Sequence, residues 1–175
     1  MANILIIYST TDGHTREICL RLKEVIEREQ HQTCLASIKE CANIDLLPFD
    51  KIVIGASIRY GKHSPLVTKF IKKNEQILDK IPNAFFSVNV VARKTEKSRP
   101  ETNPYLQKFL RQTSWRPKQL AVFAGKIDYP NYRFFDRLII RFIMWMTKGP
   151  TSLNVAIDFT DWQKVDDFGK LISKM

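Results

Sequence analysis

The chain has 175 residues, of which 44% are hydrophobic and 26% charged, the balance of a globular protein long enough to bury a sizeable core. It contains no uninterrupted apolar run of the roughly 18 residues that a transmembrane helix needs, and its N-terminus leads directly into a short apolar run, so we expect neither a membrane span nor a secretory signal. The formal net charge of +10 indicates an anionic partner: nucleic acid, an acidic membrane surface or an acidic small molecule.

The cysteines and histidines argue against disulfide and metal sites. Cys19, Cys34 and Cys41 show no CxxC spacing and cannot all pair, so we expect reduced thiols in a cytosolic protein. The three histidines are scattered along the chain without metal-ligand spacing, and we expect no metal.

The first predicted strand, Asn3–Ser9, leads into a turn rich in hydroxyl groups, and a predicted helix follows at Arg16–Glu29. Backbone N–H groups and the positive end of the helix dipole converge at such a turn, which therefore favours an anion. The turn has no Lys or Arg and matches neither GxxxxGK(S/T) nor GxGxxG, so it suits one terminal phosphate, such as that of flavin mononucleotide (FMN). The alternative is that Thr11 or Asp12 only caps the helix. The residues of this turn are Ser9, Thr10, Thr11, Asp12, Gly13, His14 and Thr15.

The rest of the chain continues the alternation of apolar strand and helix. Such strands, each followed by a helix, are typical of a parallel sheet covered on both faces. We therefore predict one α/β domain over residues 1–175, with a doubly wound five-stranded sheet in the order 2-1-3-4-5 and a ligand site at the loops 9–15, 57–63 and 89–100. Further strands are predicted at Thr33–Ile38, Lys51–Ser57, Asn83–Asn89 and Leu120–Gly125, and further helices at Pro65–Leu78, Pro104–Gln112 and Trp162–Ser173.

One segment, at about 126–153, is an insertion into this alternation, before the last helix. Within it, Tyr132–Lys148 is strongly helical, and at 100° per residue its four basic residues fall in an arc of about 80°. Much of the remainder is large and apolar, which is typical of a basic amphipathic helix that lies in a membrane interface. The alternative is a helix packed on its own domain with solvated basic residues. The basic residues are Arg133, Arg137, Arg141 and Lys148.

Several segments of the chain resemble the flavodoxin-like family and, within it, the menaquinone-dependent, oxygen-independent protoporphyrinogen IX dehydrogenases of bacteria. The resemblance implies FMN as cofactor, oxidation of protoporphyrinogen IX to protoporphyrin IX in haem biosynthesis, and electron transfer to menaquinone or another membrane quinone. It also implies a peripheral location on the cytoplasmic side of the bacterial inner membrane. The segments are YSTTDGHT at 8–15, VIGASIRYGKH at 53–63, FFSVNVVARKTEKSRPETNPY at 85–105, SWRPKQLAVFAGKIDYPNYRFFDRLIIRFIMWM at 114–146 and FTDW at 159–162.

Carried over position by position, the resemblance places the FMN phosphate at Ser9–Thr15 and the flavin ring between two loops. Asn89 offers an amide to the ring, and Tyr60 either stacks on it or is a plain surface aromatic. The first loop consists of Ser57, Ile58, Arg59, Tyr60 and Gly61, and the second of Ser87, Val88, Asn89, Val90, Val91 and Ala92.

Basic side chains in the same two loops are candidates for binding the two propionates of the substrate at the open edge of the flavin. The alternative is that each is a solvated charge. No acid–base residue is assigned. The candidates are Arg59, Lys62, Arg93, Lys94 and Arg99.

Two other functions compete with the dehydrogenase. One is a flavodoxin-like electron shuttle or quinone reductase that docks an acidic partner with its basic face. The other is a nucleic-acid binder, which we reject because the aromatic residues gather in the amphipathic helix and form no RNA-binding platform. The sequence leaves open whether the chain forms a homo-oligomer.

Overall fold

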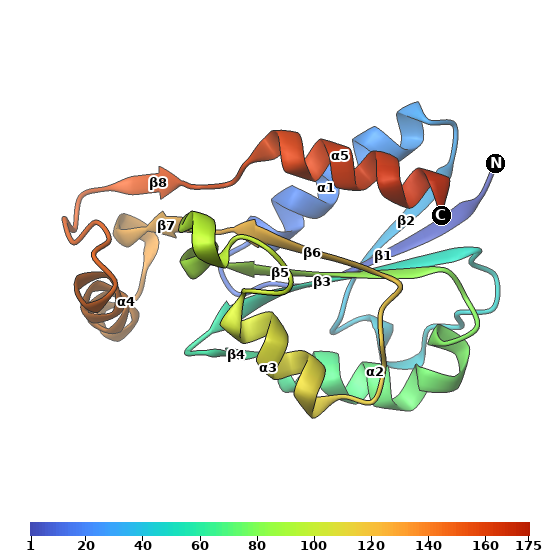
Figure 1. The fold of residues 1–175 in the computed structure, drawn as a ribbon, viewed down its shortest axis with the longest axis horizontal. Helices are drawn as coiled ribbons and strands as arrows, with labels where there is room; N and C mark the ends of the chain where they lie inside the picture. The colour runs from blue at the N-terminus through green and yellow to red at the C-terminus, as the bar shows by residue number, and fades with distance from the viewer.

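A six-stranded sheet forms the centre of the computed structural model, which describes residues 1–175 (Figure 1). Five of its strands run parallel in the order β2-β1-β3-β5-β6, and the short β4 pairs antiparallel with the end of β3. This order is the predicted 2-1-3-4-5 order of a doubly wound sheet, so the predicted fold is confirmed. The strands are β1 (Asn3–Ser9), β2 (Gln32–Ser37), β3 (Lys51–Arg59), β4 (Lys62–His63), β5 (Asn83–Asn89) and β6 (Gln119–Ala124).

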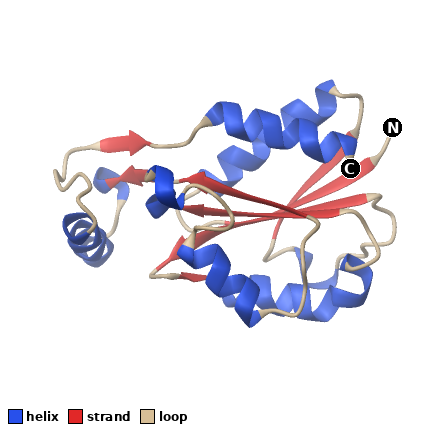
Figure 2. Ribbon diagram, viewed as in Figure 1, coloured by secondary structure: helices blue, strands red, loops and turns tan.

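Helices cover both faces of this sheet, two on each (Figure 2). The strands carry apolar side chains on both faces, which is why the sheet needs two layers of helix. In β1, Leu5 and Ile7 belong to the core cluster beneath α2 and α3, whereas Ile4 and Ile6 belong to the cluster beneath α1 and α5. The helices are α1 (His14–Arg28), α2 (Pro65–Leu78), α3 (Pro104–Gln112) and α5 (Trp162–Lys174).

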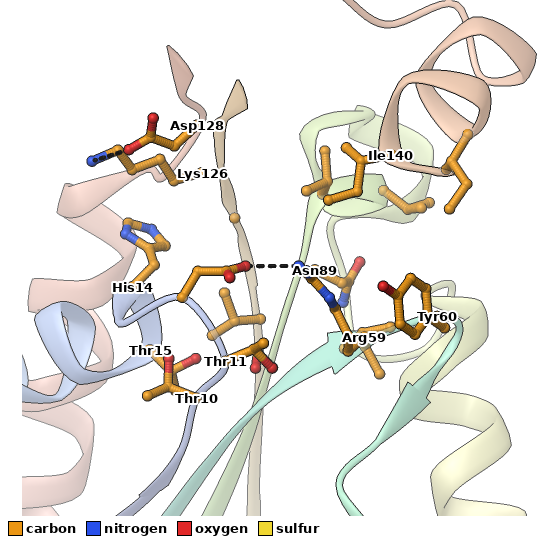
Figure 3. A pocket seen from close by; sticks show the side chains of 18 of the residues that line it. Thr10, Thr11, His14, Thr15, Arg59, Tyr60, Asn89, Lys126, Asp128 and Ile140 are labelled. Atoms are coloured by element: carbon orange, nitrogen blue, oxygen red, sulfur yellow. Dashed lines mark hydrogen bonds and ion pairs between the residues drawn. The ribbon is translucent and has the colours of Figure 1, made fainter. Parts of the chain in front are cut away.

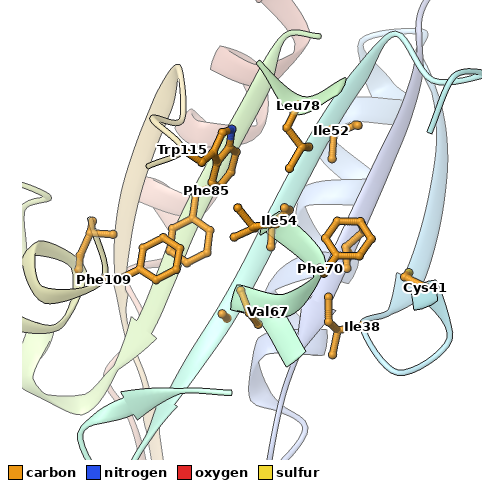
Figure 4. Close-up of a cluster of buried hydrophobic side chains, with 14 of the residues drawn as sticks. Ile38, Cys41, Ile52, Ile54, Val67, Phe70, Leu78, Phe85, Phe109 and Trp115 are labelled. Atoms are coloured by element: carbon orange, nitrogen blue, oxygen red, sulfur yellow. The ribbon is translucent and has the colours of Figure 1, made fainter. Parts of the chain in front are cut away.

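Aromatic rings fill the core between β5 and α3 (Figure 4). Phe85 stacks on Phe109 with 4.5 Å between ring centroids, and Trp115 meets Phe85 edge-on. On the other face, the Phe86 ring leaves no room for a side chain at Gly55, because a Cβ there would lie 2.1 Å from Phe86 Cζ. The sheet therefore needs glycine at this position of β3.

The insertion forms a separate small layer beyond the carboxyl ends of the sheet strands (Figure 1). Its strands β7 (Lys126–Asp128) and β8 (Ala156–Asp158) pair antiparallel, and α4 (Phe134–Met146) lies between them in the chain. No helix in the structure combines the length and the apolar character needed to cross a membrane. The chain also has four single-turn 3-10 helices: η1 (Cys41–Asn43), η2 (Val90–Arg93), η3 (Thr95–Lys97) and η4 (Tyr129–Asn131).

Two helices have a boundary that differs by two residues from the sequence-based prediction. Helix α1 begins at His14, two residues before the predicted start at Arg16, because Gly13 adopts a left-handed conformation (φ 88°) and serves as the N-cap. Helix α4 is shorter than the predicted Tyr132–Lys148 at both ends. It begins after an extended Arg133 and ends before Lys148, whose φ is 55°. The short strands β4, β7 and β8 were not predicted, since two or three residues carry no recognisable period.

Candidate functional site

A cavity of about 540 Å³ lies at the carboxyl ends of β1, β3 and β5, beneath α4 (Figure 3). This is the switch point of the doubly wound sheet, and the volume falls in the range of about 300–1,000 Å³ typical of small-molecule sites. Its floor is the turn after β1, its walls are the segments that follow β3 and β5, and α4 contributes Ile140, Ile143 and Met144. All three predicted loops therefore contribute to one site, although the third does so only through Asn89, Val90 and Val91.

The turn after β1 presents unpaired backbone donors to the cavity. Among residues 10–15, only the N–H of Gly13 has a protein acceptor, the Thr10 hydroxyl at 3.0 Å. Gly13 is the N-cap of α1 and no side chain caps this helix, so the alternative that Thr11 or Asp12 serves only as a cap is wrong. An uncapped helix start with free N–H groups is the arrangement that binds phosphate.

The Thr15 hydroxyl is the clearest sign that this turn holds a polar ligand. Thr15 is completely buried, lines the cavity, and its Oγ1 has no hydrogen-bond partner in the protein. A buried hydroxyl without a partner costs about 1–3 kcal/mol, so such groups are rare unless a ligand satisfies them. Thr10 and Thr15 both line the cavity (Figure 3). The residues present therefore fit the phosphate of FMN.

His14 fixes the same turn to the C-terminal part of the chain. Its Nε2 lies 2.6 Å from the Thr160 hydroxyl, which in turn donates to the carbonyl oxygen of Ala124 at the end of β6. Its Nδ1 lies 2.9 Å from a carboxylate oxygen of Glu17, one turn further along α1. The turn is therefore held rigidly, as a site for a small anion requires.

Arg59 links the turn after β1 to α4. Its guanidinium forms ion pairs with Asp12 at 2.8 Å and with Asp136 of α4 at 2.9 Å. Burial opposes the charge of Arg59, but the two carboxylates outweigh it and raise its pKa. Burial also raises the pKa of Asp12, and Arg59 offsets part of that rise. Asp136 additionally accepts a hydrogen bond from the Tyr60 hydroxyl, which lowers the pKa of its carboxyl group.

Tyr60 lies at the tip of the hairpin that joins β3 to β4. Tyr60 and Gly61 both have positive φ, 50° and 76°, as the central residues of a type I′ turn do. This conformation is strained for a tyrosine, and such strain is found where a side chain is held for function. The ring lines the cavity and is 52% exposed. Whether it stacks on a flavin stays a prediction.

Asn89 organises the loop after β5 through its side chain. Its Oδ1 accepts from the Ala92 N–H and from the Asn103 amide, both at 3.1 Å, and its Nδ2 donates to Ser87 Oγ at 3.3 Å and to Asn103 Oδ1 at 3.4 Å. All donors and acceptors of this amide are therefore occupied within the protein. The amide positions the loop and the adjoining α3, and whether it also contacts the ring stays a prediction.

The structure brings together most but not all of the predicted cofactor residues. All five residues of 57–61 line the cavity. Ser9, Gly13, Ser87 and Ala92 do not line it: Ser87 Oγ is engaged by His63 and Asn89, and Ala92 is buried. The predicted residues that line the cavity are Thr10, Thr11, Asp12, His14, Thr15, Ser57, Ile58, Arg59, Tyr60, Gly61, Val88, Asn89, Val90 and Val91.

Of the predicted substrate-binding residues, only Arg59 lines the cavity. Lys62, Arg93, Lys94 and Arg99 do not line it, and their binding of the propionates stays a prediction. Lys62 lies on β4 and lines a neighbouring groove, because the tight hairpin turn carries it past the cavity. Arg93 donates to the carbonyl oxygens of Val90 and Thr147, so it fixes the end of α4.

Sequence reasoning missed the residues that the insertion contributes to the cavity. They come from β7, η4 and α4, and the apolar ones were assigned to a membrane-facing surface instead. Asp136 is the only acidic residue of that helix. It was the one sequence feature that indicated an arc of the helix facing the protein. The missed residues of the insertion are Lys126, Asp128, Asn131, Tyr132, Ile140, Ile143 and Met144.

Comparison with known proteins agrees with this architecture. A family model described as a flavodoxin domain matches residues 5–154. Oxidised flavodoxin 2 from Bacillus cereus superposes with a TM-score of 0.59 at 16% identity, covering 99% of both chains. A flavodoxin from the domain Archaea gives a TM-score of 0.52 at 14% identity, covering 98% of this chain and 96% of the other. At these identities the structural likeness shows the fold alone.

Two relatives align over most of the chain. Protoporphyrinogen IX dehydrogenase (quinone) from Escherichia coli strain K12 is 42% identical over 171 residues, which are 98% of this chain and 94% of that protein. A protein of the same name from Leishmania major is 43% identical over 165 residues, 94% of this chain and 71% of the other. The chain therefore belongs to the flavodoxin-domain family and, within it, to the oxidoreductase family of the quinone-dependent protoporphyrinogen IX dehydrogenases.

Proposed function

We propose that this protein oxidises protoporphyrinogen IX to protoporphyrin IX in haem biosynthesis, with FMN as cofactor and a membrane quinone as electron acceptor. The observation that carries the proposal is the unpaired phosphate turn with its buried Thr15 hydroxyl, in a chain that is 42% identical to an enzyme of that name. When bound, FMN supplies the redox chemistry. The protein's own part is to bind the cofactor, hold its ring and keep water away from it.

Each part of the cavity supports one of these tasks. Thr10, Thr11 and Thr15, with the free N–H groups of the turn, would hold the phosphate. The segments 57–61 and 88–91 would hold the ring on either side. The apolar side chains of α4 would close the site against water, and the ion pair between Arg59 and Asp136 keeps this helix over the cavity.

The exposed face of α4 supports a peripheral location on an anionic membrane, on the cytoplasmic side of the bacterial inner membrane. Large apolar side chains gather there without any covering element: Phe135 is 76% exposed, Trp145 69% and Phe142 57%. Contiguous apolar surface of this kind is a docking site. Exposed basic residues flank it, Arg133, Arg141 and Lys148 among them. An anionic surface attracts such residues by about 1 kcal/mol each, and the apolar face adds burial in the interface.

An anaerobic assay tests the activity. The FMN-loaded protein is mixed with protoporphyrinogen IX, with and without a menaquinone analogue, and the fluorescence of protoporphyrin IX is followed. We expect catalytic turnover only when quinone is present, and none in a Thr10→Val/Thr15→Val variant, which should lack FMN. A flavin-loaded protein that turns over no porphyrinogen with any quinone would support the electron shuttle instead.

Vesicle co-sedimentation tests the location. Binding should be stronger on anionic than on zwitterionic vesicles and should weaken as salt rises. Replacing Phe135, Phe142 and Trp145 by Ser should release the protein with FMN still bound. The matched control is Leu47→Ser/Leu66→Ser, which removes exposed apolar side chains outside α4. Wild-type protein that stays in the supernatant with anionic vesicles at low salt would refute the membrane proposal.

A further inference from the structure

A second groove of about 540 Å³ lies beside the FMN cavity, between β4, the first half of α2 and α3. Four lysines from these three elements line it: Lys62, Lys69, Lys72 and Lys108. No acidic residue contributes to its walls. The floor includes Phe109 and Ile58, so the lysine side chains surround a partly apolar hollow.

These lysines are unpaired. None of the four has a carboxylate within 4.0 Å, and none donates a hydrogen bond to another group of the protein. Some basic side chains elsewhere are partnered, as Arg21 is by Asp166 and Arg59 by Asp12, and what distinguishes the four lysines is that they surround one hollow. Four like charges around one hollow repel each other, and an anionic ligand would relieve this repulsion.

The groove adjoins the FMN cavity. The two hollows share Ile58, Gly61 and Tyr105, so only the tip of the β3–β4 hairpin separates them. Gly61 has no side chain to form a barrier. A Cβ added at Gly61 would lie 3.8 Å from Cε1 of the Tyr105 ring. A macrocycle that crosses this tip can therefore present its ring to the cavity and its anionic groups to the lysines.

We propose that this lysine groove is the carboxylate subsite of the substrate and binds the two propionates of the porphyrinogen. The inference rests on the proposed function. It keeps Lys62 from the candidates that the sequence indicated and adds Lys69, Lys72 and Lys108. Lysine suits this task because its ammonium group is a mobile point charge that can follow a flexible propionate. The same field would attract the dianionic substrate from solution.

The test compares a diacid porphyrinogen with its uncharged dimethyl ester. Two variants, Lys69→Gln/Lys72→Gln and Lys62→Gln/Lys108→Gln, are measured against a control with the same change in net charge, Lys170→Gln/Lys174→Gln on α5. The readout is the ratio of kcat/KM for protoporphyrinogen IX to kcat/KM for its ester, in the same detergent. We expect the ratio to fall at least tenfold in both groove variants and to stay at the wild-type value in the control.

A binding arm separates this inference from the proposed activity. Equilibrium binding of mesoporphyrin IX and of its dimethyl ester is followed by fluorescence, without turnover. If the wild type turns over protoporphyrinogen but the groove variants match the control in both arms, the subsite is wrong and the activity stands. If the wild type turns over no porphyrinogen but binds the diacid through these lysines, the activity is wrong and the subsite stands. If the groove variants lose binding to anionic vesicles but keep the wild-type preference for the diacid over its ester, the groove binds lipid and the inference is overturned.

Discussion

Replacing Thr15 by Val should raise the stability of the FMN-free protein and lower its affinity for FMN. Thr15 is completely buried, and its hydroxyl has no partner in the protein. Valine has the same shape without the polar atom, so the FMN-free protein no longer buries an unsatisfied group. The free energy of unfolding should therefore rise by about 1 kcal/mol, the lower end of the usual cost. For a chain of this length, that raises Tm by about 2–4 °C.

The effect on FMN has the opposite sign. A hydrogen bond to a charged group contributes about 1.5–3 kcal/mol, so losing the one to the phosphate should raise the Kd for FMN about 10- to 150-fold. Fluorescence titration gives the Kd, and thermal unfolding of the FMN-free protein gives Tm. Thr15→Ser is the control, since it keeps the hydroxyl and should keep FMN affinity. A Thr15→Val protein that binds FMN as tightly as the wild type would show that the phosphate lies elsewhere.

Three further predictions follow from the packing and the ion pairs. Gly55→Ala should lower the free energy of unfolding by about 1–3 kcal/mol in denaturant titration, because its Cβ collides with the Phe86 ring, and Phe86→Leu in the same chain should restore part of the loss. Burial lowers the pKa of His63 to about 4 from its ordinary 6.5. The unfolded chain therefore binds a proton at this histidine that the folded chain does not, and the stability that is present above pH 6.5 is lost as the pH falls toward 4. Between pH 7 and pH 5 the free energy of unfolding should fall by about 2 kcal/mol, and His63→Gln should flatten that part of the pH–stability profile. Asp136→Asn should remove the ion pair to Arg59 and increase hydrogen exchange in residues 134–146, with little change in the global Tm; unchanged exchange there would mean that the apolar contacts alone hold α4.

The fold was predictable because the same local sequence pattern, an apolar strand and then an amphipathic helix, recurs along the chain. The central strands, such as Ile4–Ile7 in β1, are buried on both faces, and β1, β3 and β5 each lead to a helix with one apolar face. The edge strand β2 is the exception, since it is only partly buried and reaches β3 without an α-helix. Such a pattern allows few topologies, and the observed strand order is the one that it predicts. The turn at 9–15 was also predictable, because a strand end, a glycine and a helix start suffice to place it.

The directions of loop side chains were not predictable in the same way. Arg93 follows β5 closely in the sequence, yet its guanidinium donates to the carbonyl oxygen of Thr147 at the end of α4. Asn89 lines the cavity, but Asn103 takes part of its hydrogen-bonding capacity. Both partners are distant in the sequence, and no local pattern indicates them. The lysine groove was missed for the same reason, since α2 and α3 meet β4 only in the folded chain.

Helix α4 shows why a helical wheel did not settle which surface this segment faces. The alternatives from sequence were a membrane-facing helix and a helix packed on its own domain, and the structure divides the apolar residues between two arcs. Ile140, Ile143 and Met144 face the cavity, while Phe135 and Trp145 lie on the exposed side. A helix that is apolar on two sides needs two apolar environments. The first is the cavity, and the exposed arc still lacks its own. A membrane interface would supply it and would place the roof of the FMN site where a quinone can reach it.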